Sequence, residues 1–211
     1  GKFHGLHGTG SEHIPQGERR RRGSGTMQGM CCFDLHSHST ASDGTLTPVE
    51  LLTKARGAGV DVLALTDHDT LDGIAEAHDA AQQQGVALIA GVEISVTWKA
   101  MTLHVLGLNV DPHNPALLAG LKALRDTRDS RAQEIGRKLE QRGIPGALEG
   151  ASRLSRGKIL SRTHFAHFLV ESGRAASVRD VFRHFLVKGK PGYVRGEWAS
   201  LEQALGWIKG A

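Results

Sequence analysis

Apolar residues after position 32 follow two patterns, one typical of buried strands and one of amphipathic helices. The run Val60 to Thr66 is apolar and β-branched, which predicts a strand buried on both faces, and Val86 to Ala90 is a second such run. Helices are predicted on either side of the first run: Thr47 to Glu50 can form a capping box, and residues 71–84 end at a glycine. With a first strand from Phe33, this alternation predicts a parallel sheet and an α/β fold.

The pattern changes after residue 93. Residues 94–98 and 101–108 predict a hairpin that turns at Lys99 and Ala100. If Trp98 pairs with Met101, Glu93 and His104 lie on one face of the sheet as diagonal neighbours.

Residues 113–190 are predicted to form an inserted helical subdomain, because the stretch is too long for a plain loop. Its apolar positions keep helical spacing from Pro115 to about Gln141, and shorter helices are expected near 163–171 and 178–187. A last helix is expected at 201–209. The predicted domains are therefore a leader (1–29), a first barrel part (30–112), the insertion (113–190) and a returning barrel segment (191–211).

Composition adds limits to this outline. The formal net charge of +4 lies mostly in residues 1–30, which include Arg19 to Arg22 and lack apolar periodicity, so this segment is interpreted as a disordered leader. Cys31 and Cys32 are expected to be small core residues of the first strand. No apolar run approaches the length of a membrane span, and no secretory signal is present, so we expect a cytoplasmic protein with no membrane partner.

Candidate ligands for metal ions occur at the carboxyl ends of the predicted strands. A strand turns alternate side chains to one face, so Asp34, His36 and His38 point the same way. Further candidates follow in the loops and on the hairpin, and the set is His36, His38, Asp43, His68, Glu93 and His104. Each alone is more often an ordinary core or loop group, but their shared position at one sheet edge favours a metal site.

Imidazole and carboxylate ligands without thiolate suit zinc, manganese or iron. A carboxylate such as Glu93 has two oxygens and can bridge two ions, and paired ions can activate a water and hold a phosphoryl group. This chemistry indicates a hydrolase.

Four segments, DLHSHSTASDGTLTP, LALTDHDTLDG, GVEIS and LHVLGL, resemble in order and spacing the polymerase-and-histidinol-phosphatase (PHP) metallohydrolases. The helical segments GIPGALEGA, SRTHFAHFLVESG and FLVKGKPGYV resemble the subgroup that removes the 3′-phosphate of nucleoside 3′,5′-bisphosphates, whose members are also described as 5′→3′ exoribonucleases. The resemblance implies a distorted (β/α)7 barrel, here incomplete, and a metal-dependent phosphoesterase.

The resemblance also implies roles for individual residues. His36 and His38 would hold one metal, Glu93 would bridge it to a second bound by His104, and Asp43 and His68 would bind a third ion or the substrate. The ions, two or three in the complete protein, would be manganese, with zinc or iron as alternatives. A metal-bound hydroxide would attack the phosphorus.

Substrate-binding candidates are Arg162, His164, Asp67 and Lys99. Arg162 and His164 begin a predicted helix, where free backbone N–H groups favour anions. The expected partner is a small nucleotide or a short RNA, and no protein partner is evident. The alternative interpretations are a histidinol-phosphatase-like enzyme, a DNA exonuclease, or a non-catalytic metal-binding module.

The family supplies further ligands from a later His-Pro segment and from an Asp-x-His segment near the carboxyl end, and neither occurs here. We therefore expect a C-terminal truncation, and the 211-residue chain itself could be inactive.

Overall fold

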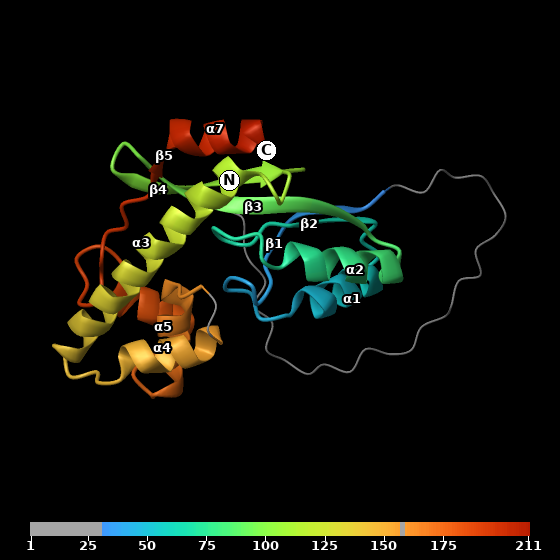
Figure 1. Ribbon diagram of the computed structural model, residues 1–211. Coiled ribbons are helices and arrows are strands. Elements are labelled where there is room, and N and C mark those ends of the chain that lie inside the picture. The colour runs from blue at the N-terminus through green and yellow to red at the C-terminus, as the bar shows by residue number, and fades with distance from the viewer. Residues whose placement is uncertain (1–30, 157–158) are drawn as a thin grey trace, which may run out of the picture. The chain divides into compact units, whose positions relative to one another are not determined.

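The computed structural model describes residues 31–156 and 159–211, which fold around a five-stranded sheet (Figure 1). The strands are β1 (Phe33–Ser37), β2 (Val62–Leu65), β3 (Ala87–Trp98), β4 (Met101–Leu108) and β5 (Ala199–Ser200). Their order is β1-β2-β3-β4, and β5 also pairs with β3. The first three strands are parallel, β4 is antiparallel to β3, and β5 is parallel to it. The predicted α/β fold is confirmed.

Strand β3 is longer than predicted and runs through Gly91 without a break. The prediction ended the parallel strand at Ala90 and began the hairpin at Ile94, whereas one strand serves both pairings. A Cβ at position 91 would lie 3.0 Å from the Leu65 carbonyl oxygen and 3.1 Å from that of Gly107. The glycine therefore permits a close approach of neighbouring strands, and it does not end the strand.

The hairpin has the predicted register. Trp98 pairs with Met101, and Ser95 pairs with His104. Lys99 and Ala100 have φ values of 45° and 64°, so both central residues of the turn lie in the left-handed region that such tight turns require.

Two helices pack together beside the parallel strands (Figure 1): α1 (Pro48–Gly57) and α2 (Ile74–Gln84). The capping box between Thr47 and Glu50 is present at α1, as predicted. Helix α2 begins three residues later than predicted and ends at Gly85, whose φ of 66° is left-handed.

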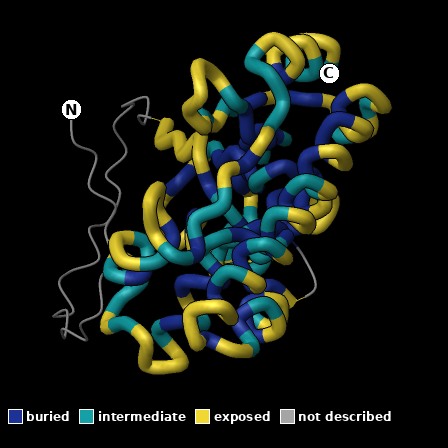
Figure 2. The backbone as a smooth tube through the Cα atoms, turned by 90° about the vertical axis from the view of Figure 1, so that its left-hand side faces the viewer, coloured by how far each residue is buried: buried dark blue, intermediate teal, exposed yellow. Residues whose placement is uncertain are grey.

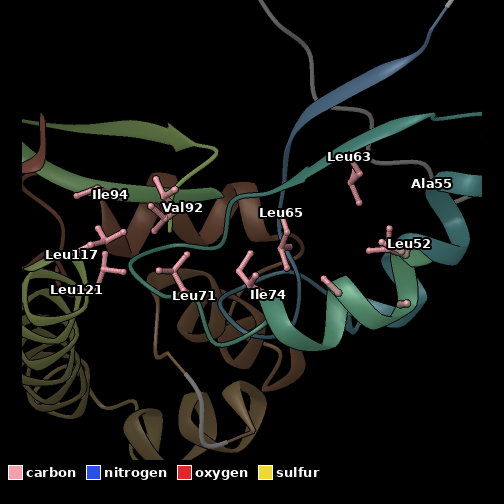
Figure 3. Close-up of a cluster of buried hydrophobic side chains, with 14 of the residues drawn as sticks. Leu52, Ala55, Leu63, Leu65, Leu71, Ile74, Val92, Ile94, Leu117 and Leu121 are labelled. Atoms are coloured by element: carbon pink, nitrogen blue, oxygen red, sulfur yellow. The ribbon is translucent and has the colours of Figure 1, made fainter. Parts of the chain in front are cut away.

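Helix α3 (Pro115–Glu140) connects two hydrophobic cores. Its first half contributes Leu117 and Leu121 to the core under the sheet, which also contains Leu65 and Ile94 (Figure 3). Its second half contributes Ile135 and other side chains to a second core, which is built mainly from helices.

The second core is closed by short helices: α4 (Ala147–Ser155), α5 (Arg162–Glu171), α6 (Val178–Val181) and the π-helix η1 (Phe182–Leu186). Helix α7 (Leu201–Gly210) follows β5 and packs against the sheet side. The predicted helices near 163–171, 178–187 and 201–209 are present, although the second changes from α to π geometry at Phe182. Helix α4 was not predicted, because its buried side chains are mostly Ala and Gly and give little apolar signal.

Cys31 and Cys32 were expected in the core, and that prediction is wrong. Both are exposed and unpaired, and they precede β1. Within the described residues, buried positions lie mostly in the interior and many exposed positions lie at outer turns (Figure 2).

Residues 31–211 form one compact unit, and the predicted leader lies outside the described residues. The boundaries of the inserted subdomain remain predictions. Within the described ranges, every helix is too short or too polar to cross a bilayer.

Candidate metal centre

The predicted metal ligands lie together at the carboxyl ends of the parallel strands. His36 is in β1, His38 follows it by two residues, and His68 lies three residues beyond the end of β2. His68 forms an isolated parallel bridge with Glu93 of β3, which continues the sheet pairing past the end of β2. His104 is brought alongside by β4. Parallel pairing therefore places residues far apart in sequence at one edge.

Glu93 is at the centre of this group. Its Oε2 atom lies 2.9 Å from His36 Nε2, 3.0 Å from His38 Nε2 and 3.6 Å from His68 Nδ1. Its Oε1 atom lies 3.7 Å from His104 Nδ1. One carboxylate is thus shared among four imidazoles, as the hairpin register predicted for Glu93 and His104.

The side chains form three overlapping groups that could each hold a divalent ion. The groups are His36, His38 and Glu93; His38, Asp43 and His68; and His68, Glu93 and His104. In each group the ligand atoms lie within 4.8 Å of one another.

The distances in the first group fit an ion. His36 Nε2 and His38 Nε2 are 3.1 Å apart, and both are close to the same Glu93 oxygen. An ion with bonds of about 2.0–2.2 Å holds adjacent ligand atoms roughly 3.0–3.5 Å apart. Buried Nδ1 atoms of His38 and His68 also lack a hydrogen-bond partner within residues 31–156 and 159–211. An unpaired buried imidazole nitrogen is costly, and coordination through Nδ1 of His68 would satisfy that atom.

The pKa shifts of Glu93, His68 and His104 favour the forms that coordinate metal. Burial alone would raise the pKa of Glu93, but the hydrogen bond to His38 and the charge of His68 lower it to about 2. Burial lowers the pKa of His68 to about 4, and it also lowers the pKa of His104. Burial opposes protonation of His38 too, yet the Glu93 carboxylate raises its pKa above the usual value. At neutral pH, Glu93 is ionised and His68 is neutral, which are the forms that coordinate metal.

Asp43 connects the sheet edge to the helical part of the chain. Its Oδ1 atom lies 4.0 Å from His68 Nε2, and its Oδ2 atom accepts hydrogen bonds from Ser161 Oγ at 3.3 Å and Thr163 Oγ1 at 3.2 Å. Ser161 also caps α5. The start of α5 is therefore fixed beside the metal ligands.

A buried ion pair, which the sequence analysis did not predict, lies next to the metal ligands and connects the elements that carry them. Arg128 Nε of α3 donates to Asp69 Oδ2 at 2.6 Å, and Arg128 Nη2 donates to Ser95 Oγ at 2.8 Å. Asp69 also accepts from the Ser95 amide at 2.8 Å. Asp69 is fully buried, and Arg128 is 7% exposed. This network joins α3 to the loop after β2 and to β3, directly beside His68 and Glu93.

Three of the predicted substrate-binding residues have their side chains occupied elsewhere. Asp67 is buried and accepts hydrogen bonds from Ser39 and Ser42, so it holds the loop after β1. His164 Nδ1 accepts from the Ser161 amide at 3.1 Å and caps α5. Lys99 lies at the hairpin turn with its Nζ atom 4.5 Å from the centre of the Trp98 ring.

Arg162, the fourth, lines a cavity of about 230 Å³ beside the metal ligands. Asp43, His68 and His104 form one part of its wall. The other part is basic and aromatic, with Arg128, Arg131, Arg162, Phe182, Tyr193 and Trp198. Sequence reasoning missed Arg131 and Tyr193 as site residues. The three-residue spacing of Arg128 and Arg131 on α3 was a usable signal for a shared helix face, whereas nothing local indicates Tyr193.

Comparisons with known proteins identify the family of this chain. The family model described as PHP domain matches residues 34–208. A 3′,5′-nucleoside bisphosphate phosphatase from Chromobacterium violaceum is 50% identical over 183 residues, which are 86% of this chain and 64% of that protein. The 5′-3′ exoribonuclease Rnm of Escherichia coli K12 is 49% identical over 175 residues, 82% of this chain and 60% of that protein.

A solved structure from Bifidobacterium adolescentis, described as a candidate metal-dependent phosphoesterase, superposes with a TM-score of 0.82 at 27% identity, covering 87% of this chain and 65% of that one. The chain spans less than two thirds of the length of these relatives. The family match, which extends from β1 into α7, shows that the chain belongs to the PHP domain family.

Proposed function

We propose that the protein is a metal-dependent phosphoesterase that removes the 3′-phosphate of nucleoside 3′,5′-bisphosphates and releases nucleotides from RNA 5′ ends. The observation that carries this proposal is the cavity that joins His68, His104 and Asp43 to Arg131 and Arg162. Candidate metal ligands and a cationic wall within one cavity of about 230 Å³ fit a small molecule with two phosphates.

The electrostatics of the cationic wall favour a bound anion. Burial and the charges of Arg162 and Arg128 lower the pKa of Arg131 to about 10, and burial with the Arg128 charge also lowers the pKa of Arg162. Both guanidinium groups stay charged at neutral pH. Neither has a carboxylate within ion-pair distance in the described part of the chain. A phosphate between them would offset this repulsion and accept their N–H groups.

The metal ligands would be His36, His38, Asp43, His68, Glu93 and His104, as the sequence predicts. Divalent ions bound there would supply an activated water and offset the charge of the phosphoryl group. Arg131 and Arg162 would bind the second phosphate, and Tyr193 and Trp198 in the same wall would contact the nucleoside. Asp67 would position the loop that carries Ser39 and Ser42.

Manganese is the proposed metal, with zinc or iron as the alternatives, because the ligands are imidazoles and carboxylates without thiolate. The names of the two curated relatives support nucleotide and RNA substrates for this chain. A cytoplasmic location stays a prediction.

The proposal is tested with purified protein, Mn²⁺ and adenosine 3′,5′-bisphosphate. We expect phosphate release, and we expect Arg162→Gln to raise KM about tenfold or more because a charged contact to phosphate is lost. Arg174→Gln, at an exposed arginine outside the cavity, is the matched control and should leave KM unchanged.

Two results would contradict the proposal. Turnover of histidinol phosphate without turnover of the bisphosphate would show that the substrate is wrong. Bound metal in elemental analysis, with no turnover of any phosphoester, would favour the non-catalytic module.

A further inference from the structure

We propose that a basic track along α3 and the loop beside it binds the RNA chain beyond the nucleotide that occupies the metal cavity. The inference rests on the proposed function, and it names a polymeric substrate for the same site. The track begins at Arg128 and Arg131, which line the metal cavity, and continues outside it to Lys138, Arg142 and Lys190.

Four basic residues share one face of the α3 segment. Arg128, Arg131, Lys138 and Arg142 are separated by three, seven and four residues, which are the spacings that stack side chains on one side of a helix. Arg142 lies just after the end of α3. With a rise of about 1.5 Å per residue, the track from Arg131 to the end of the helix is roughly 14 Å long.

A second cavity lies at the far end of this face. It has a volume of about 360 Å³ and is lined by Lys138, Gln141, Arg142, Gly189, Lys190 and Pro191. Among the described residues that line it, Lys138, Arg142 and Lys190 are basic and none is acidic. Arg142 and Lys190 are both exposed. A site of this composition fits a phosphate group of a flexible chain.

A hydrogen bond links the walls of the two cavities. Tyr193 lines the metal cavity, and its carbonyl oxygen accepts a hydrogen bond from Lys138 Nζ at 2.9 Å, while Lys138 lines the second cavity. Arg131 Nε donates to the Val194 carbonyl at 2.9 Å. These bonds fix residues 193–194 along α3, and Figure 1 shows the chain after η1 running beside that helix.

Apart from Arg128, which pairs with Asp69, the basic residues of the track have no carboxylate within ion-pair distance among residues 31–156 and 159–211. Glu134 lies three residues after Arg131 on this face, and its carboxylate is paired with Arg137 at 2.6 Å. Glu140 is nine residues from Arg131, which places it on the opposite side of the helix. A mononucleotide in the metal cavity has no group left to reach Lys190, whereas a single strand carries a phosphate at every nucleotide. The hydrogen-bonded link between the cavity walls and the unpaired basic residues at the far cavity therefore favour RNA over a compact anion.

The test uses a double variant that carries both Arg142→Gln and Lys190→Gln. Its RNA binding is compared with that of the unchanged full chain. Binding is measured by fluorescence anisotropy with 5′-phosphorylated single-stranded RNA of two to ten nucleotides, in EDTA so that no turnover occurs. Arg174→Gln with Arg179→Gln, two exposed arginines outside both cavities, is the matched control. Residues 1–30, which include Arg19 to Arg22, are the same in all proteins, so their contribution cancels.

We expect the double variant to bind the longer RNAs about tenfold more weakly at ~50 mM salt, and to bind dinucleotides like the unchanged chain. The slope of log affinity against log salt should fall by about 0.7 for each phosphate contact that is lost. Equal losses in the control variant, or a loss independent of RNA length, would overturn the proposal. Polyglutamate that displaces RNA at equal charge concentration would also overturn it, because the surface would then be unspecific for nucleic acid.

The outcome is separable from the proposed activity. Hydrolysis of adenosine 3′,5′-bisphosphate is measured on the same proteins with Mn²⁺. Absent hydrolysis with length-dependent loss of RNA binding would contradict the proposed function and support the track. Normal hydrolysis without a length-dependent loss of RNA binding would support the proposed function and contradict the track.

Discussion

The ion pair between Arg128 and Asp69 is buried beside the metal ligands. Removing it should strongly lower the free energy of unfolding. Their side chains are 7% and 0% exposed, and the Nε to Oδ2 distance is 2.6 Å. Arg128→Met would leave the Asp69 carboxylate buried without its cation. We expect the free energy of unfolding, measured with urea, to fall by about 3–5 kcal/mol.

The same helix provides a control for this prediction. Lys122 of α3 pairs with Asp126 at 2.7 Å, but the two side chains are 69% and 63% exposed. Because water screens this pair, Lys122→Met should change the free energy of unfolding by less than about 0.5 kcal/mol. If both variants lost similar amounts of unfolding free energy, burial would not explain the contribution of the Arg128–Asp69 pair to stability.

At the residue scale, the position of the candidate metal ligands could be predicted, whereas of the cationic wall only Arg162 was. The period of two in β1 and the positions at strand ends are local properties, so they place His36, His38 and His68 from sequence alone. Arg131 and Tyr193 come together because α3 docks against the loop after η1, and no local pattern encodes that contact. The error at Cys31 and Cys32 has the same origin. Their small side chains suit a core, but both are exposed because tertiary packing leaves them uncovered.

At the element scale, glycines in helices show how packing overrides intrinsic helix propensity. A Cβ at Gly150 of α4 would lie 2.1 Å from the Phe168 ring of α5, whereas a Cβ at Gly206 of α7 would contact nothing within 4 Å. Gly150→Ala should therefore destabilise the protein by about 1–3 kcal/mol, although alanine is the better helix former. Gly206→Ala should stabilise it by about 0.5–1 kcal/mol.

Thermal or urea unfolding of both glycine variants checks this pair. The two substitutions are chemically identical and both lie inside helices, so the difference in sign isolates the contact with Phe168. If Gly150→Ala were also stabilising, α4 and α5 would pack less closely than the structure shows.

The elements themselves were predicted well where a cap or a strand run marks them. The capping residue Thr47 and the turn at Lys99 set boundaries that hydrogen bonding confirms. Helix α4 has no such signal, since its buried face is small and its packing partner is α5. The continuity of β3 through Gly91 was likewise hidden, because a glycine in a strand can mark either a break or a close approach.

At the scale of the whole molecule, metal binding should stabilise the fold. The proposed ligands come from β1, β3, β4 and the loops after β1 and β2, so bound ions would cross-link the sheet edge. We expect Mn²⁺ at 100 times its dissociation constant to raise the free energy of unfolding by about 2.7 kcal/mol for each site, and EDTA to reverse the gain. His68→Gln should remove most of this effect, whereas His78→Gln, at an exposed histidine of α2, should retain it.

The two hydrophobic cores should respond separately to damage, even though α3 passes through both. Trp198 and Trp207 pack against the core under the sheet, and Trp98 ends β3. Tryptophan fluorescence thus reports the sheet side, while far-ultraviolet circular dichroism also reports the helices of the second core. Leu169→Ala removes a fully buried side chain of that second core and should cost about 2–5 kcal/mol there. The dichroism midpoint in urea should then fall below the fluorescence midpoint. Coincident shifts of both midpoints would instead mean that α3 transmits the loss to the sheet and makes the two cores one cooperative unit.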